Sequence, residues 1–286
     1  MDIFLLGGGR YRGSVLNGTR MVNQMRANHD LGIMETLILG HAYLAAGLLT
    51  GLVKGNDRIR LDVTCDGPVQ GISVDSSARG EIRGYLRNSR LQIDSPLQSF
   101  DTAPFIGRGT LSVTRQTEGS KQPVSGHVRL QHGALAADLA NYFLESEQKP
   151  SAVALSIHFD RTGTVTGAGA LFIQALPESD QSIAGELDAT VAALPSLGSA
   201  LAGGETTAHF INTHFTAFEP EIIGSRVAEM SCPCGQDRFE RYLRSLPAHE
   251  INSILAEGPL PVKVTCHYCG STYIYEEETV QTFVAR

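Results

Sequence analysis

The sequence lacks an excess of basic residues. Its 286 residues include 23 lysines and arginines against 30 aspartates and glutamates, which gives a formal net charge of −7. Binding to the phosphates of a nucleic acid requires a basic face. The charge therefore argues against nucleic acid as the main partner.

The sequence also lacks an export signal. In MDIFLLGGGRYRG, Asp2 occupies the region where a signal peptide is positive, and the apolar run breaks at Gly7. The longest uncharged stretch, residues 36–53, is just long enough to cross a membrane, but it contains His41, three glycines and two threonines. We predict a buried helix there, no membrane partner, and a cytoplasmic protein whose thiols stay reduced.

Signatures of several common enzymes are missing. The segment PAHEINSI has His249 and Glu250 but no second histidine four residues after the first, so it is not a zincin motif. GAGALF (residues 167–172) lacks the third glycine of a dinucleotide loop, and GGGRYRGS (residues 7–14) lacks the ending of a phosphate loop. We interpret both glycine segments as turns and sites of close packing.

Hydrophobic periodicity predicts an α+β fold, because strands dominate and the helices are grouped rather than inserted between every pair of strands. Residues 58–65 alternate strictly and place Ile59, Leu61, Val63 and Cys65 on one face, so Cys65 is expected in the core. The predicted helices are 17–27, 31–54 and 135–146, and the predicted strands are 58–65, 69–74, 81–86, 109–114, 127–131, 153–159 and 165–175.

Lysine and arginine are missing from residues 162–225, which carry seven acids. Residues 187–201 have the pattern of a poor amphipathic helix, broken by Pro195 and Gly198 and followed by Gly203 and Gly204. Two interpretations stay open: an acidic interdomain linker, or a segment whose marginal stability is functional. The seven acids are Glu178, Asp180, Glu186, Asp188, Glu205, Glu219 and Glu221.

Four of the five cysteines lie in the last 55 residues, as Cys232-x-Cys234 and, 31 residues later, Cys266-x-x-Cys269. Four thiolates at this spacing suit a tetrahedral Zn²⁺ site built from two short knuckles, the second on a β-hairpin over residues 262–275. A segment of this length is at the lower limit for folding on its own core, and a metal ion would supply the missing stability. Adjacent residues seldom both ligate one ion, so His267 is expected beside the site or in solvent.

The same cysteines suit redox chemistry. Two thiolates held so close together form a disulfide readily once a metal leaves, and Arg238, Lys263 and the ion would keep the sulfurs in the oxidisable thiolate form. A thioredoxin-like role is disfavoured, because the segment after Cys269 has the pattern of a hairpin rather than a helix N-terminus. From the chemistry alone, a redox switch and an inert structural site remain equally open.

The C-terminal block combines CPC (residues 232–234), LPAHEINSILAEG (residues 246–258) and CHYCGSTYIY (residues 266–275). Weaker matches are CDGPVQGISV (65–74), NYFLESEQKPSAV (141–153) and GALFIQALP (169–177). With these segments the chain resembles, over nearly its full length, the redox-regulated 33 kDa heat-shock chaperone family.

The resemblance implies an ATP-independent holdase of the oxidative stress response and not an enzyme. It implies a core and dimerisation domain (1–177), a metastable linker (178–228) and a zinc-binding redox-switch domain (229–286). In the reduced, inactive form Cys232, Cys234, Cys266 and Cys269 would hold one Zn²⁺ per chain. Oxidation would form the disulfides Cys232–Cys234 and Cys266–Cys269, release zinc and unfold the linker, so that the homodimer captures unfolding client proteins in the cytoplasm.

The alternative is a purely structural zinc-knuckle protein in translation or nucleic-acid binding, which the negative charge disfavours.

Overall fold

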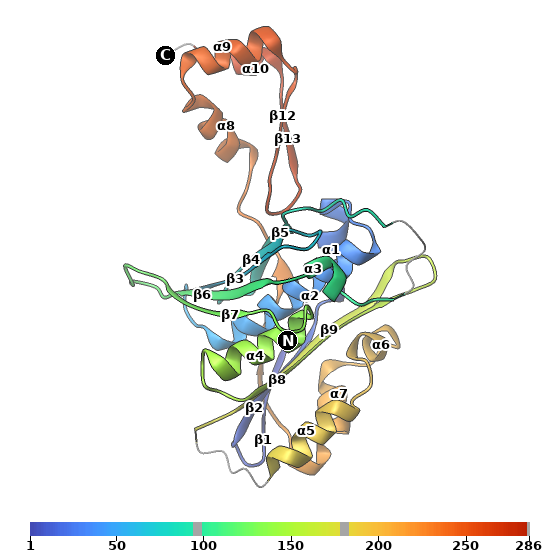
Figure 1. Ribbon diagram of the computed structural model, residues 1–286. Helices are drawn as coiled ribbons and strands as arrows, with labels where there is room; N and C mark the ends of the chain where they lie inside the picture. The colour runs from blue at the N-terminus through green and yellow to red at the C-terminus, as the bar shows by residue number, and fades with distance from the viewer. Residues whose placement is uncertain (94–98, 178–182, 285–286) are drawn as a thin grey trace. The chain divides into compact units, whose positions relative to one another are not determined.

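The computed structural model describes residues 1–93, 99–177 and 183–284, and the chain divides into two compact units, Met1–Ser231 and Cys232–Arg286 (Figure 1). The α+β prediction is confirmed. The strands form three sheets that are almost wholly antiparallel, and the helices occur in groups rather than between successive parallel strands. Residues 178–182 lie outside the described residues. They include Glu178 and Asp180, and the expected domain boundary after residue 177 lies at their edge. The three-part division stays a prediction.

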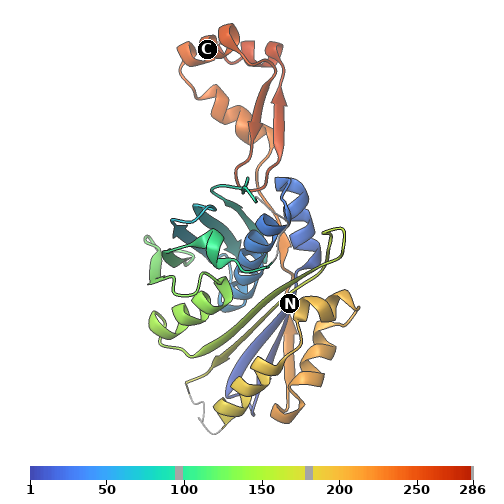
Figure 2. The same cartoon turned by 45° about the vertical axis from the view of Figure 1, so that its right-hand side comes forward.

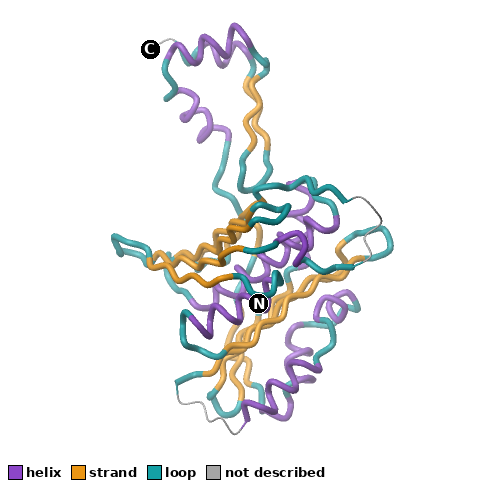
Figure 3. Tube along the Cα trace, in the orientation of Figure 1, coloured by secondary structure: helices purple, strands orange, loops and turns teal. Residues whose placement is uncertain are grey.

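A five-stranded antiparallel sheet in the order β10-β1-β2-β9-β8 forms one layer of the first unit (Figure 3). Its strand β9 is buried along almost its whole length, which is why VTGAGALFIQA shows no alternation of polar and apolar residues. The glycines of GGGRYRGS at positions 7–9 all have positive φ and form the turn between β1 and β2, as predicted. The strands are β1 (Asp2–Leu6), β2 (Tyr11–Asn17), β8 (Ser151–Phe159), β9 (Val165–Ala175) and β10 (Glu221–Ser225).

A six-stranded sheet in the order β11-β5-β4-β3-β6-β7 forms a second layer. Strand β3 alternates as the sequence predicts, with Ile59, Leu61 and Val63 buried. The prediction that Cys65 lies in the core is wrong: it is only half-buried, because β3 ends there and the chain turns toward solvent at Asp66. The strands are β3 (Arg58–Cys65), β4 (Gly71–Ser77), β5 (Glu81–Leu86), β6 (Gly109–Gln116), β7 (Val124–Arg129) and β11 (Glu229–Met230).

Helix α2 (Ile33–Leu49) contacts strands of both sheets, and 15 of its 17 residues are buried. Together with the short 3-10 helix η1 (Thr50–Leu52), α2 forms a segment, Ile33–Leu52, that is long and apolar enough to cross a membrane. However, 89% of its most apolar 18-residue stretch is buried inside the structure. The prediction of a buried core helix is confirmed. Helices α1 (Thr19–His29) and α4 (Leu135–Glu145) lie beside it, and α3 (Ala103–Ile106) precedes β6.

Three short helices after β9 cover the other face of the five-stranded sheet (Figure 2): α5 (Ala184–Ala193), α6 (Leu197–Ala202) and α7 (Thr207–His214), followed by the 3-10 helix η3 (Thr216–Phe218). The single poor helix expected over 187–201 is broken at Leu194, whose extended backbone is the conformation that a residue before proline prefers. The helices and the sheet share one apolar cluster. Its buried members are Phe4, Leu6, Tyr11, Val15, Leu171, Ile173, Leu187, Leu197, Leu201, Phe210, Ile211, Phe215 and Phe218.

Residues 221–231, here called the strap, tie this helical segment to both sheets. Strand β10 pairs with β1, and β11 pairs in parallel with β5. Between them, Arg226 donates hydrogen bonds from its guanidinium to the carbonyl oxygens of Thr50 (2.8 Å) and Val53 (2.9 Å). These acceptors lie in and directly after η1, the 3-10 helix that continues α2.

The second unit contains α8 (Gln236–Arg244), α9 (Ala248–Glu257), the hairpin β12 (Val262–Thr265) and β13 (Thr272–Tyr275), and α10 (Glu277–Gln281). The hairpin confirms the prediction for residues 262–275. The buried core of this unit is small, and its members are Leu243, Ile251, Tyr275, Val280 and Phe283.

Candidate metal centre

The first cysteine loop is Cys232-Pro233-Cys234, directly before helix α8. Pro233 fixes its own φ and has no N–H to satisfy, which stiffens the short connection between the two thiols. The carbonyl oxygen of Gly235 then accepts from the N–H groups of Arg238 (3.1 Å) and Phe239 (3.2 Å) and starts the helix. Cys234 is therefore held two residues before the first turn of α8.

The second loop lies at the tip of the β12–β13 hairpin. The Cys266 N–H donates to the Ser271 carbonyl (2.8 Å), and the Cys266 carbonyl accepts from the Gly270 N–H (2.8 Å). Gly270 has φ +70°, a left-handed conformation that a side chain would strain. This turn brings Cys266 and Cys269 to the same side of the hairpin tip.

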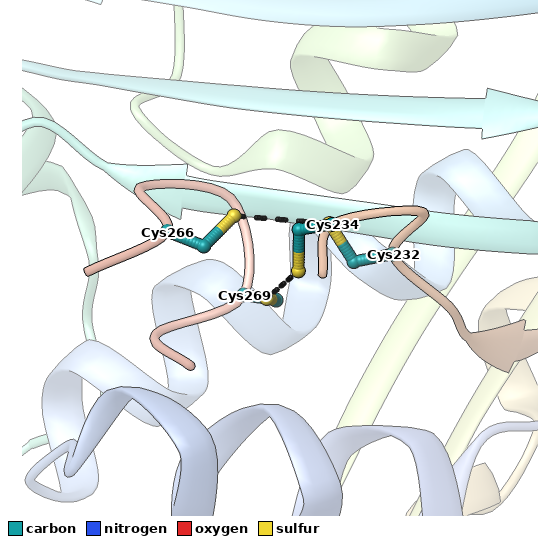
Figure 4. A group of neighbouring side chains, drawn as sticks. All are labelled: Cys232, Cys234, Cys266 and Cys269. Atoms are coloured by element: carbon teal, nitrogen blue, oxygen red, sulfur yellow. Dashed lines mark hydrogen bonds between the residues drawn. The ribbon is translucent and has the colours of Figure 1, made fainter. Parts of the chain in front are cut away.

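The two loops bring the four sulfurs together. Their Sγ atoms all lie within 4.8 Å of one another, and Figure 4 shows the side chains pointing toward a common centre. The Cys232 and Cys266 sulfurs are 3.8 Å apart, and the Cys234 and Cys269 sulfurs 3.3 Å. Cys266 and Cys269 are buried, at 6% and 3% exposed, whereas Cys232 and Cys234 are half-buried.

This arrangement fits a tetrahedral zinc ion. Four Zn–S bonds of about 2.3 Å at tetrahedral angles require sulfur atoms about 3.8 Å apart. The Cys232–Cys266 separation of 3.8 Å equals that value, the Cys234–Cys269 separation of 3.3 Å is shorter, and all four sulfurs lie within 4.8 Å of one another. The sulfurs are those of free thiols rather than disulfides. The donor set, four thiols and no carboxylate, favours zinc over magnesium or calcium.

The acidity of the thiols supports the need for a cation. Burial raises the pKa of the Cys234 thiol to about 12, and burial also raises the pKa of the Cys266 thiol. For Cys269 burial acts to raise the pKa, but the hydrogen bonds with Ser271, Cys234 and Cys266 together outweigh it and lower the pKa. Arg238 and Lys263, which the sequence suggested as the source of positive charge, are not among the groups that shift these pKa values. A bound cation would stabilise the thiolate forms of Cys234 and Cys266 against this effect of burial.

Two hydroxyl groups complete the surroundings of the sulfurs. The Tyr273 hydroxyl lies 3.1 Å from Cys234 Sγ, and the Ser271 hydroxyl lies 3.3 Å from Cys269 Sγ. The sequence predicts Tyr273 only as one residue of the β-hairpin over residues 262–275. Its position four residues after Cys269 and opposite Val264 is the signal that could have placed it near the site. His267 is exposed, as expected.

Comparisons with known proteins agree over nearly the whole chain. The family described as Hsp33 protein matches residues 1–276. A 33 kDa chaperonin of Desulforamulus reducens is 32% identical over 279 residues, which cover 97% of this chain and 94% of the relative. A 33 kDa chaperonin of Limosilactobacillus fermentum is 32% identical over 282 residues, which cover 97% of this chain and 95% of the relative.

The fold also matches a solved structure. The crystal structure of the 33 kDa chaperonin from Thermotoga maritima superposes with a TM-score of 0.86 and 27% sequence identity, over 99% of this chain and 98% of the other. The length of the family match, the relatives and the fold all support the same family. The chain belongs to the Hsp33 family of 33 kDa chaperonins, and it is a chaperone.

Proposed function

We propose that this protein is a redox-regulated, ATP-independent holdase that is inactive when reduced and zinc-bound and is activated by oxidation. Cys232, Cys234, Cys266 and Cys269 hold one Zn²⁺ per chain in the reduced form. Oxidation forms the disulfides Cys232–Cys234 and Cys266–Cys269 and releases the ion. The protein then binds unfolding clients and prevents their aggregation during oxidative stress.

The observation that carries this proposal is the position of the four-sulfur cluster in a unit with a very small core. In the described part of this unit five large apolar side chains are buried, in a cluster that includes Tyr275 at the end of the hairpin opposite Cys266 and Cys269. When bound, zinc supplies the charge that holds four thiolates together, and in such small modules the binding energy is folding energy, on the order of 10–16 kcal/mol. Loss of the cluster therefore removes the main source of stability of the unit.

Oxidation with a peroxide balances without any cofactor. One thiolate attacks a peroxide oxygen, the O–O bond breaks, and a sulfenic acid and hydroxide form. The second thiolate of the same loop attacks that sulfur, the S–S bond forms, and hydroxide leaves. Two thiolates, one H₂O₂ and two protons thus give one disulfide and two waters. The new disulfides close loops of only a few residues, so they constrain the unfolded chain little and do not replace the lost stability.

The helical segment after β9 is suited to unfold next. Helices of 10, 6 and 8 residues are too short to be stable alone, so α5, α6 and α7 depend on their packing against the five-stranded sheet. Their release would expose apolar side chains from both surfaces. The strap connects the loss of the sulfur cluster to the unfolding of α5, α6 and α7. Its last residue, Ser231, donates its N–H to the Ile82 carbonyl at 2.9 Å and directly precedes Cys232.

The remaining parts of the proposal follow from the family. We place the protein in the cytoplasm as a homodimer assembled through the core, acting by binding clients and not by catalysis. The net charge of −7 gives no support to nucleic-acid binding.

An aggregation assay tests the proposal. A chemically unfolded client is diluted into buffer with reduced protein or with peroxide-treated protein, in the absence of ATP, and light scattering is recorded. We expect suppression only by the oxidised protein, and the same difference between reduced and oxidised forms in the control variant Cys65→Ser, which keeps all four clustered cysteines. Equal suppression by the reduced and oxidised proteins, or none by either, would leave only a structural role for the cysteine cluster.

A further inference from the structure

The outer edge of strand β1 is occupied by the first strand of the strap, β10. Met1 and Arg226 form a hydrogen-bonded pair: the Arg226 N–H donates to the Met1 carbonyl at 2.8 Å, and the Met1 amino group donates to the Arg226 carbonyl at 2.9 Å. Such pairs recur at every second residue of an antiparallel ladder. Ile3, which lies opposite Gly224, and Leu5 therefore direct their N–H and C=O groups toward β10 as well.

The two strands of this pair are held in very different ways. Strand β1 also pairs with β2 along all five of its residues, and its Phe4 and Leu6 are fully buried. Strand β10 is the outermost strand of its sheet in the described part of the chain, and all five of its residues are exposed, Ile222 and Ile223 included. Hydrogen bonds between main chains thus hold β10, whereas β1 keeps its place without it.

This edge can accept chains of many sequences. Because the side chains of β10 are exposed, its pairing with β1 requires an extended main chain of about five residues and little else. A sheet edge whose N–H and C=O groups lose their partner is a template for another extended chain. Unfolding proteins supply such chains, since the strands of their own sheets lose their partners.

We propose that release of the strap frees the edge of β1, and that an extended segment of an unfolding client protein then adds to this edge in the place of β10. The proposal rests on the proposed redox function and adds to it a surface and a mode of recognition. In the reduced protein β10 belongs to the same chain, so it competes with clients at a high effective concentration and keeps the edge closed.

Peptides test this mode of recognition on the full chain. The first peptide has the sequence of residues 219–227, and it should bind the oxidised protein and not the reduced protein. Methylation of its Gly224 nitrogen removes a donor that faces β1, and we expect binding at least about tenfold weaker. Methylation of the Ser225 nitrogen is the matched control, because Ser225 lies opposite Asp2 in a pair without hydrogen bonds, and that peptide should bind like the unmodified one.

Hydrogen exchange locates the bound peptide. In the oxidised protein the amides of Ile3 and Leu5 should lose protection, and the peptide should restore it. The amide of Phe4 faces β2 and should stay protected throughout. A second peptide of nine alternating valines and threonines should give the same protection, because the edge recognises main chain rather than sequence.

A substitution in the strap opens the edge without oxidation. Gly224→Pro removes the N–H that faces β1, and the reduced variant should bind the first peptide. Gly224→Ala is its matched control: a Cβ there would meet nothing within 4 Å, so this variant keeps the N–H, and in the reduced form it should exclude the peptide as wild type does.

Equal binding of the two methylated peptides would overturn the proposal, as would a bound peptide that leaves Ile3 and Leu5 unprotected. Binding of the strap sequence but not of the valine–threonine peptide would assign the edge to the strap of a second copy instead of to clients. An oxidised wild type that does not suppress aggregation would contradict the proposed function. In that case the peptide experiments on reduced Gly224→Pro still decide whether the edge of β1 accepts a strand.

Discussion

Gly167 of strand β9 and Gly198 of helix α6 lie in direct backbone contact. A Cβ at Gly167 would lie 2.7 Å from the Ala202 nitrogen and closer still to the Gly198 carbonyl, and a Cβ at Gly198 would lie 2.9 Å from Ser156 Oγ. No side chain separates helix and strand at this point. The glycine segment GAGALF, predicted from the sequence to serve close packing, is the surface on which the helical segment rests.

Substitution at this contact should loosen the helical segment without touching a cysteine. We expect Gly167→Ala to push α6 away from β9 and to destabilise the packing by about 1–3 kcal/mol, the usual cost of overpacking. The reduced variant should bind clients more strongly than reduced wild type and should be cleaved faster by protease between residues 183 and 218. Limited proteolysis and the aggregation assay measure the two effects.

Gly185→Ala is the control for that experiment. Gly185 is an exposed residue of α5, and a Cβ there would meet nothing within 4 Å. Alanine raises helix propensity by up to about 1 kcal/mol, so this variant should be cleaved no faster than wild type. If Gly167→Ala and Gly185→Ala behave alike, the glycine contact does not hold the segment in place.

The metal prediction concerns stoichiometry. Reduced protein should carry one zinc per chain, and Cys232→Ser should weaken binding severely, because one of four thiolates is lost from sulfurs that lie within 4.8 Å of one another. Metal analysis of protein purified under reducing conditions, with competition by a chelator, gives both quantities. Cys65→Ser is the matched control and should bind zinc like wild type. Zinc retained by a variant lacking all four clustered cysteines would refute the assignment.

Arg226 offers a test of the strap. Its two hydrogen bonds to the Thr50 and Val53 carbonyls involve a charged donor, and Arg226→Gln should lower the free energy of unfolding by about 1–3 kcal/mol. The exposed Arg79 bonds to Asn56, and Arg79→Gln should change stability by less than about 0.5 kcal/mol. Urea unfolding of the reduced proteins compares them. Equal effects of the two substitutions would mean that the strap is held by β10 and β11 alone.

His41 predicts a pH dependence of the core. Burial lowers the pKa of its imidazole from 6.5 to about 4, and its Nε2 has no hydrogen-bond partner in the described part of the chain. Below pH 6.5 the unfolded chain takes up a proton that the folded chain does not, so stability is lost as the pH falls from 6.5 toward 4. The loss attributable to His41 should reach about 3 kcal/mol.

His41→Leu should remove this part of the pH dependence. Urea unfolding of the reduced wild type and the reduced variant gives the free energy of unfolding of each at pH 7.5 and pH 4.5. The loss of stability between the two pH values is then compared between the two proteins. Parallel stability curves for the two proteins over this range would show that His41 does not titrate with the shifted pKa.

The elements that the sequence predicts well are those with one buried face or a long apolar run. Strand β3 and helix α2 are examples, because alternation and continuous burial leave a clear pattern. The cysteine hairpin was predictable for another reason, since ligand spacing and Gly270 determine the turn.

The elements that the sequence does not predict have weak local patterns. Strands β1 and β2 join a sheet with helices on both faces, and the three glycines between them mask the hairpin. All five residues of β10 are exposed, so only its pairing with β1 makes it a strand. Helix α8 buries a single residue, Leu243. The contact of Tyr273 with Cys234 depends on hairpin register and could not be read from spacing alone.

Hydrogen exchange on reduced and peroxide-treated protein tests most directly the central claim, that the sulfur cluster and the helical segment after β9 unfold together. The account predicts that oxidation abolishes protection after Cys232 and also between residues 183 and 218, including Leu187, Leu197 and Leu201, while α2 and the core strands of both sheets stay protected. If protection is lost only after Cys232 and the segment from 183 to 218 stays protected, that segment is not part of the switch and the account is contradicted.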